Sequence, residues 1–114
     1  MTVAVLSMIG CGKVGKTLGY LWHQHGIFRL GGVLNRSLAS SQAAVDFMQA
    51  GTVAPSLQAL PATDVFLLGC ADNDLAACCE QLVASGKVRT GNIVLHCSGA
   101  LSSSVLAPAK AVGA

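Results

Sequence analysis

The chain has 114 residues, a length that supports one small domain with a hydrophobic core of its own. Its net charge is only +2 and charged residues make up 11% of it, so the charge balance gives no case for binding nucleic acid. No apolar run approaches the ~18 residues of a membrane span, and the N-terminus lacks the basic start of a signal peptide. We therefore expect a cytoplasmic protein that does not enter a membrane.

The apolar content, 53% of the residues, is high for so small a domain. It predicts either an apolar surface that another domain or subunit covers, or a parallel sheet buried on both faces. The five cysteines are odd in number and form no Cys-x-x-Cys pair, which favours buried thiols in a reducing cytoplasm over disulfides or a metal site.

The first half of the chain alternates between strand and helix patterns. The apolar run Val3–Ile9 predicts a strand, and apolar residues three and four apart predict a helix from Val14 to about His25. Phe28–Leu34 predicts the second strand. A second helix follows, beginning at Ser37 or Ser40 and ending near Gln49 with Gly51 after it. Its inward-facing residues are predicted to be Ala43, Ala44, Phe47 and Met48.

The second half repeats this alternation. A short strand is predicted over Thr52–Ala54 and one helical turn over Ser56–Leu60. A strand follows over Asp64–Gly69, a helix over Asp74–Ser85 and a strand over Asn92–Cys97. A last helix is predicted to begin at Ser102 or Ser103. Such alternation predicts a doubly wound α/β domain with a parallel sheet, and right-handed crossovers predict the strand order 3-2-1-4-5. We expect residues 1–114 to form one domain, the N-terminal part of a longer protein.

A glycine-rich turn joins the first predicted strand to the first predicted helix. Its pattern is Gly-x-Gly-x-x-Gly, formed by Gly10, Cys11, Gly12, Lys13, Val14 and Gly15. Glycines let the backbone approach an anion closely, and the N–H groups of the helix's first turn then point at that anion. The turn therefore predicts a pyrophosphate-binding site in the manner of dinucleotide-binding domains.

The same stretch also matches the P-loop pattern of nucleoside triphosphatases. Gly10–Thr17 reads Gly-Cys-Gly-Lys-Val-Gly-Lys-Thr. A P-loop enzyme needs an acid at the carboxyl end of a core strand to hold Mg²⁺. Asp64 stands at the wrong end of its predicted strand, and Asp72 follows the strand a few residues late, as a helix cap does. We therefore favour a dinucleotide, with Lys16 and Thr17 on the solvent side of the helix.

The end of the second predicted strand indicates which dinucleotide. It reads Leu34-Asn35-Arg36-Ser37 and contains no acid to accept a hydrogen bond from a ribose 2′-hydroxyl. Arg36 can instead pair with a 2′-phosphate, to which the Ser37 hydroxyl can donate. These residues favour NADP(H) over NAD(H), although Arg36 could also be a solvated loop residue.

Taken together, these motifs resemble a known group. The glycine turn, the Asn35–Ser37 strand end and the segment Val65–Asn73 resemble the N-terminal Rossmann-fold domain of the 6-phosphogluconate-dehydrogenase-like reductases, which include pyrroline-5-carboxylate reductases and F420-dependent NADP oxidoreductases. The segment His96–Leu101, His-Cys-Ser-Gly-Ala-Leu, is similar to Rossmann-like proteins that carry a C-terminal DUF2520 domain. The resemblance covers nearly the whole chain.

The resemblance implies an NADP(H)-dependent oxidoreductase that transfers hydride to or from a small carbonyl, imine or hydroxy acid. It implies that Cys70, Ala71 and Asp72 lie along the cofactor, and that Ser98, Gly99 and Ala100 border the nicotinamide and the substrate. It also implies a helical second domain that completes the substrate pocket, often across a homodimer, so that this chain alone binds cofactor but turns over little.

The catalytic residues stay open at this point. His96 ends a predicted strand near the expected site, where it could act as an acid or base or play a structural part. Ser98 fits a contact to substrate or nicotinamide better than a nucleophile, because no base accompanies it. A non-catalytic NADP(H) sensor or scaffold is the alternative function, and a P-loop hydrolase is the third.

Overall fold

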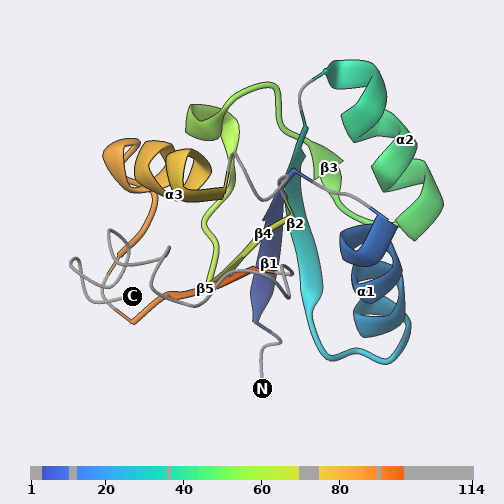
Figure 1. The fold of residues 1–114 in the computed structure, drawn as a ribbon. Coiled ribbons are helices and arrows are strands. Elements are labelled where there is room, and N and C mark those ends of the chain that lie inside the picture. The colour runs from blue at the N-terminus through green and yellow to red at the C-terminus, as the bar shows by residue number, and fades with distance from the viewer. Residues whose placement is uncertain (1–3, 11–12, 36, 70–74, 90, 97–114) are drawn as a thin grey trace.

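The structure is a computed structural model that describes residues 4–10, 13–35, 37–69, 75–89 and 91–96. Five parallel strands form one sheet in the order β3-β2-β1-β4-β5, which confirms the predicted order (Figure 1). In chain order the elements are β1 (Val5–Ile9), α1 (Lys13–Gln24), β2 (Arg29–Leu34), α2 (Leu38–Met48), β3 (Thr52–Val53), the 3₁₀ turn η1 (Leu57–Ala59), β4 (Val65–Leu68), α3 (Leu75–Ala84) and β5 (Ile93–His96). The predicted last helix lies outside the described residues.

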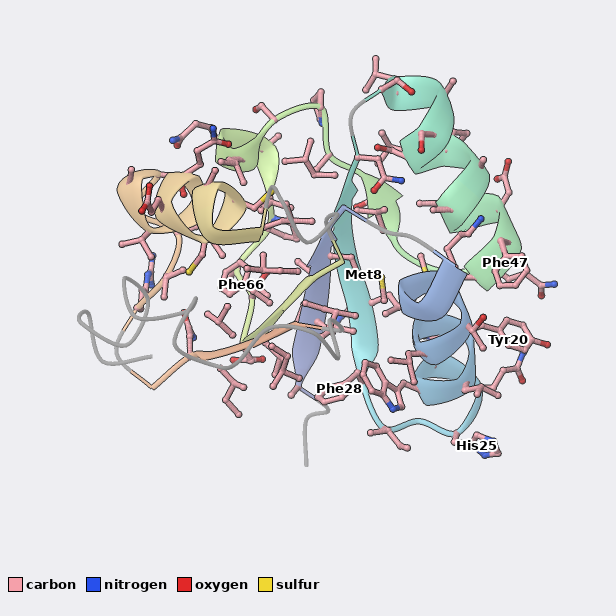
Figure 2. The ribbon with its side chains drawn as sticks, in the orientation of Figure 1. Met8, Tyr20, His25, Phe28, Phe47 and Phe66 are labelled. Atoms are coloured by element: carbon pink, nitrogen blue, oxygen red, sulfur yellow. The ribbon has the colours of Figure 1, made fainter. Side chains whose placement is uncertain are left out.

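The sheet is covered on both faces. Helices α1 and α2 lie against one face and α3 lies against the other (Figure 1). Alternate residues of the central strands β1 and β4 enter the two cores, so Met8 packs toward α1 and Phe66 packs toward α3 (Figure 2). Burial of the central strands on both faces accounts for their continuous apolar runs.

The inward face of α2 differs from the predicted one. Ala44 and Met48 are buried as expected, but Ala43 and Phe47 are exposed, and Ser41 is buried in their place. Ser41, Ala44 and Met48 are three and four residues apart, so they form one stripe along the helix. Phe47 projects from the neighbouring side of α2 and contacts Tyr20 of α1, with ring centroids 6.2 Å apart.

The predicted helix ends are largely confirmed. Gly26 has φ +67° just after α1, the left-handed conformation expected of a glycine that ends a helix. At the end of α2, however, Gln49 takes the left-handed conformation with φ +56°, and Gly51 lies at the start of β3 instead. Gly51 has φ +89°, which strains residues with a Cβ, and a Cβ there would also lie 3.2 Å from the carbonyl oxygen of Gly31, so the backbone conformation and the close approach of the two strands both favour glycine.

A bulge interrupts the pairing of β1 with β2. The register passes from Leu6 opposite Leu30 to Met8 opposite Val33, so β2 contains one extra residue. The buried Ser7 compensates, because its Oγ accepts a hydrogen bond from the backbone N–H of Gly32 at 3.1 Å. The same oxygen lies 2.7 Å from Oγ1 of Thr63, which ties the bulge to the start of β4.

The other composition-based expectations concern cysteines and membranes. Cys79 is buried against the sheet and Cys78 is half-buried, whereas Cys11, Cys70 and Cys97 lie outside the described residues. Across the described part of the chain, no three His, Cys, Asp or Glu side chains gather as metal ligands would. No helix in that part is both long enough and apolar enough to cross a bilayer.

Candidate functional site

The residues singled out in the sequence follow strands that end at one edge of the sheet. Ile9 at the end of β1 pairs with Leu34 of β2 and with Leu68 of β4. Leu68 in turn pairs with His96, the last residue of β5. The carboxyl ends of four parallel strands therefore meet side by side, and in open α/β sheets this is the edge at which ligands bind.

The glycine turn begins in the geometry that its sequence predicts. Gly10 has φ +73°, a conformation that strains residues with a Cβ, and its N–H donates to the carbonyl oxygen of Leu34 at 2.8 Å. Helix α1 starts three residues later, at Lys13, and Gly15 in its first turn is buried. Cys11 and Gly12 lie outside the described residues, and of Lys13 and Val14 only the helical backbone is described.

The electrostatics of this helix end suit an anion. The first turn of α1 contains no acidic residue. Its N–H groups have no acceptor within the helix and carry the positive end of the helix dipole. A phosphate bound there would meet partial positive charge and no carboxylate from this turn.

Lys16 has a different position from the one that a P-loop needs. It is half-buried, and its Nζ lies 5.4 Å from the centroid of the Phe47 ring on α2. Phe47 and Tyr20 lie together on the side of the two helices that faces away from the sheet (Figure 2). A P-loop lysine reaches the β- and γ-phosphates, whereas this ammonium is directed toward an aromatic ring of the neighbouring helix. The predicted solvent position thus holds for the exposed Thr17 and only partly for Lys16.

Asp64 also lies as the sequence predicted, at the far edge of the sheet. It precedes β4, and its Oδ2 accepts a hydrogen bond from the backbone N–H of Val5 at 2.8 Å, where β1 begins. This carboxylate is therefore at the amino ends of the strands and cannot hold a cation at the glycine turn.

The connection from β2 to α2 is held by serines. The backbone N–H of Asn35 donates to Oγ of Ser41 at 2.8 Å, and the side-chain Nδ2 of Asn35 donates to Oγ of Ser40 at 3.1 Å. Ser37 is the N-cap of α2, and its Oγ accepts from the backbone N–H of Ser40 at 3.1 Å. The first turn of α2 contains no acidic residue, and Arg36 itself lies outside the described residues.

Sequence reasoning missed the two serines that bind Asn35. Their signal in the sequence is weak: Ser40 and Ser41 stand in the first turn of α2 after its cap, Ser37, and serine is a poor residue inside a helix. Ser40 and Ser41 lie five and six residues after Asn35, a separation at which the first turn of α2 places their hydroxyls beside the end of β2.

The remaining candidates follow β4 and β5. The N–H of Gly69 donates to the carbonyl oxygen of Ile9 at 2.9 Å, which extends the pairing of β4 with β1 to the end of the strand. His96 ends β5 as predicted, and its backbone alone is described. The other candidates lie outside the described residues: Cys70, Ala71, Asp72, Ser98, Gly99 and Ala100.

The family follows from a match over almost the whole chain. A family model described as "Rossmann-like domain" matches residues 2–114. The chain belongs to the Rossmann-like domain family. No curated protein sequence matches it significantly.

Several oxidoreductases have solved structures with the same fold. Arogenate dehydrogenase from Synechocystis superposes with a TM-score of 0.77 at 16% identity, over 95% of this chain and 37% of that one. Imine reductase from Aspergillus terreus superposes with a TM-score of 0.70 at 23% identity, over 99% of this chain and 39% of that one. Quinate dehydrogenase from Corynebacterium glutamicum gives a TM-score of 0.66 at 18% identity, over 98% of this chain and 43% of that one. This Rossmann-like chain thus spans less than half the length of each.

Proposed function

We propose that this chain is the NADP(H)-binding domain of an oxidoreductase that transfers hydride to or from a small carbonyl, imine or hydroxy acid. One observation carries the proposal. The glycine turn after β1 and the Arg36-containing connection after β2 leave the sheet at adjacent strand ends, joined by the hydrogen bond from Gly10 to Leu34. A dinucleotide with a phosphate on its adenosine ribose needs anion-binding groups at these two places.

In this proposal the glycine turn binds the pyrophosphate of the cofactor. The positive φ of Gly10 and the acid-free first turn of α1 fit close approach by an anion. The residues that would hold it are Gly10, Cys11, Gly12, Lys13, Val14 and Gly15.

The β2–α2 connection binds the adenosine end of the cofactor, where NADP(H) has its 2′-phosphate. The guanidinium of Arg36 can form paired hydrogen bonds to a 2′-phosphate. Ser37 uses its oxygen to accept the capping bond from Ser40, so its hydroxyl hydrogen is still able to donate to a ligand. With no acid in the first turn of α2, nothing in that turn repels the extra phosphate.

The similar structures support a nicotinamide cofactor but do not choose between its two forms. The imine reductase structure is a complex with NADPH4, and the quinate dehydrogenase structure is a complex with NAD. The same fold therefore accommodates either class, and the preference for NADP(H) rests on Arg36 and Ser37 of this chain.

The proposal also assigns residues to the nicotinamide end of the cofactor and to the substrate. A nicotinamide cofactor bound here supplies the hydride chemistry, while the protein orients it. Following the family resemblance, Cys70, Ala71 and Asp72 would lie along the cofactor, and Ser98 and Gly99 would border its reactive end, with Ser98 and His96 as candidates for catalysis. A helical domain of the DUF2520 type, in a homodimer, would complete the pocket for a small-molecule substrate.

Calorimetric titration with NADPH, NADH and Mg²⁺–ATP tests the proposal. A charged hydrogen-bond pair is worth about 1.5–3 kcal/mol, so NADPH should bind about tenfold to a hundredfold more tightly than NADH. Binding of Mg²⁺–ATP without NADPH would instead support the P-loop alternative. A longer protein that contains this domain should oxidise NADPH in the presence of substrate, whereas a sensor or scaffold would bind the cofactor without turnover.

A further inference from the structure

Ser41 is a polar residue in a position that packing alone would give to alanine. Its side chain is 1% exposed and lies in the stripe of α2 that also contains Ala44 and Met48. Alanine has the higher helix propensity, and a buried hydroxyl is costly unless it forms a hydrogen bond. The presence of serine at position 41 is therefore explained by the group with which its hydroxyl forms a hydrogen bond.

That group is the backbone N–H of Asn35. The last pair between β2 and β3 joins Val33 to Val53, Leu34 still pairs with Ile9 of β1, and β2 ends there. The Oγ of Ser41 accepts from Asn35 at 2.8 Å at this point, in the role that a strand carbonyl would have. The helix thus holds the first residue past the strand end.

Both neighbours of Arg36 in the chain are held in the same way. Asn35 is bound through its backbone to Ser41 and through its side chain to Ser40. Ser37 is bound through its Oγ to the N–H of Ser40 and through its carbonyl oxygen to the N–H of Ser41, at 3.0 Å. The backbone on either side of Arg36 is therefore fixed to the first turn of α2.

We propose that Ser41 is a positioning residue that sets the preference for NADPH over NADH. This inference rests on the proposed function. Ser41 is too deeply buried to touch a cofactor, so it acts through Asn35 on the segment that receives the 2′-phosphate. Paired hydrogen bonds from a guanidinium tolerate little displacement, and NADH lacks the group that uses them.

The glycine turn and Ser41 bind opposite sides of one planar peptide group, because the Leu34 carbonyl accepts from Gly10 and the Asn35 N–H donates to Ser41. Without the Ser41 hydroxyl this peptide group still has its bond from Gly10, and Leu34 still pairs with Ile9 of β1, so the glycine turn stays attached to the sheet. Loss of the Ser41 hydroxyl should therefore spare the affinity that NADPH and NADH share.

Ser41→Ala tests the inference, with Ser7→Ala as the matched control. Both serines are buried, and each accepts a hydrogen bond from one backbone N–H, that of Asn35 or that of Gly32. Both variants should lower the melting temperature, Ser7→Ala by more, because the Oγ of Ser7 also forms a hydrogen bond with Oγ1 of Thr63. Ser41→Ala should weaken NADPH binding about tenfold and leave NADH binding within about twofold, because only the 2′-phosphate contact is displaced. Ser7→Ala should change neither affinity.

Two further measurements keep the test decisive. Amide hydrogen exchange at Asn35 should accelerate in Ser41→Ala and stay unchanged in Ser7→Ala. Ser40→Ala alters an exposed side chain, so it should fold normally even if Ser41→Ala does not. It should weaken NADPH binding by about threefold while sparing NADH, since it removes one side-chain bond to Asn35.

The possible outcomes distinguish a failure of this inference from a failure of the proposed function. If the unaltered chain prefers NADPH and the Ser41 and Ser40 variants keep that preference, the positioning role is wrong and the proposed function stands. Equal losses of NADPH and NADH in Ser41→Ala would also overturn the positioning role. An unaltered chain that binds NADH as tightly as NADPH would overturn the cofactor preference and the positioning role together.

Discussion

The backbone N–H of Gly10 donates a hydrogen bond to the carbonyl oxygen of Leu34, 2.8 Å away. This bond joins the ends of β1 and β2 at the point where each chain segment leaves the sheet. The glycine turn follows one end and the Asn35–Ser37 connection follows the other, so the two halves of the candidate site are built on one paired unit. Variants in the first half should affect any dinucleotide, and variants in the second should affect NADPH alone.

Gly10→Ala should weaken NADPH and NADH to the same degree. A Cβ at φ +73° costs about 1–2 kcal/mol, and relief of that strain shifts the turn away from the pyrophosphate. Thermal unfolding and titration with both cofactors measure the two effects.

Gly26→Ala is the control for that strain. Gly26 has φ +67°, a Cβ there would meet nothing within 4 Å, and the residue lies past the far end of α1. It should lose comparable stability and keep full affinity for both cofactors. If it weakened binding as much as Gly10→Ala does, the loss would reflect stability and the turn would have no special part in binding.

Arg36→Ala should discriminate between the cofactors. Loss of a charged hydrogen-bond pair of about 1.5–3 kcal/mol corresponds to about tenfold to a hundredfold weaker NADPH binding, with NADH binding nearly unchanged. Arg29→Ala is the control, because it removes the same charge from an exposed residue at the amino end of β2. A similar loss in both variants would point to a general effect of positive charge and refute a specific 2′-phosphate contact.

Lys16→Ala should leave NADPH binding within about twofold, because its ammonium lies over Phe47 and contributes about 0.5–1 kcal/mol as a cation–π pair. The expected effect is a small drop in melting temperature, and Phe47→Leu should produce a larger one, because it also removes the ring contact with Tyr20. A large loss of nucleotide binding in Lys16→Ala alone would restore the P-loop alternative, in which this lysine contacts phosphates.

The sheet order could be predicted because it depends on a coarse pattern, the alternation of apolar strands with helices. The inward face of α2 could not, because its apolar residues do not mark one side clearly. Where α2 approaches the sheet, small side chains fit, and the stripe includes the polar Ser41 next to Ala44. The largest apolar residue of the helix, Phe47, packs on α1 instead.

The glycine turn and the Asn35–Ser37 strand end could be identified because each lies within a few residues of its strand. The serines that bind Asn35 could not, because a serine near a helix start usually acts as a cap for its own helix. Ser37 does so, whereas Ser40 and Ser41 bind back to the preceding strand end, a relation that depends on the angle at which α2 leaves the sheet.

A crystal structure of this chain with NADPH tests the central claim most directly. We expect the pyrophosphate to lie against the first turn of α1 and the 2′-phosphate to lie within hydrogen-bonding distance of the Arg36 guanidinium. Absence of NADPH from this edge of the sheet, or a 2′-phosphate that points away from Arg36, would contradict it.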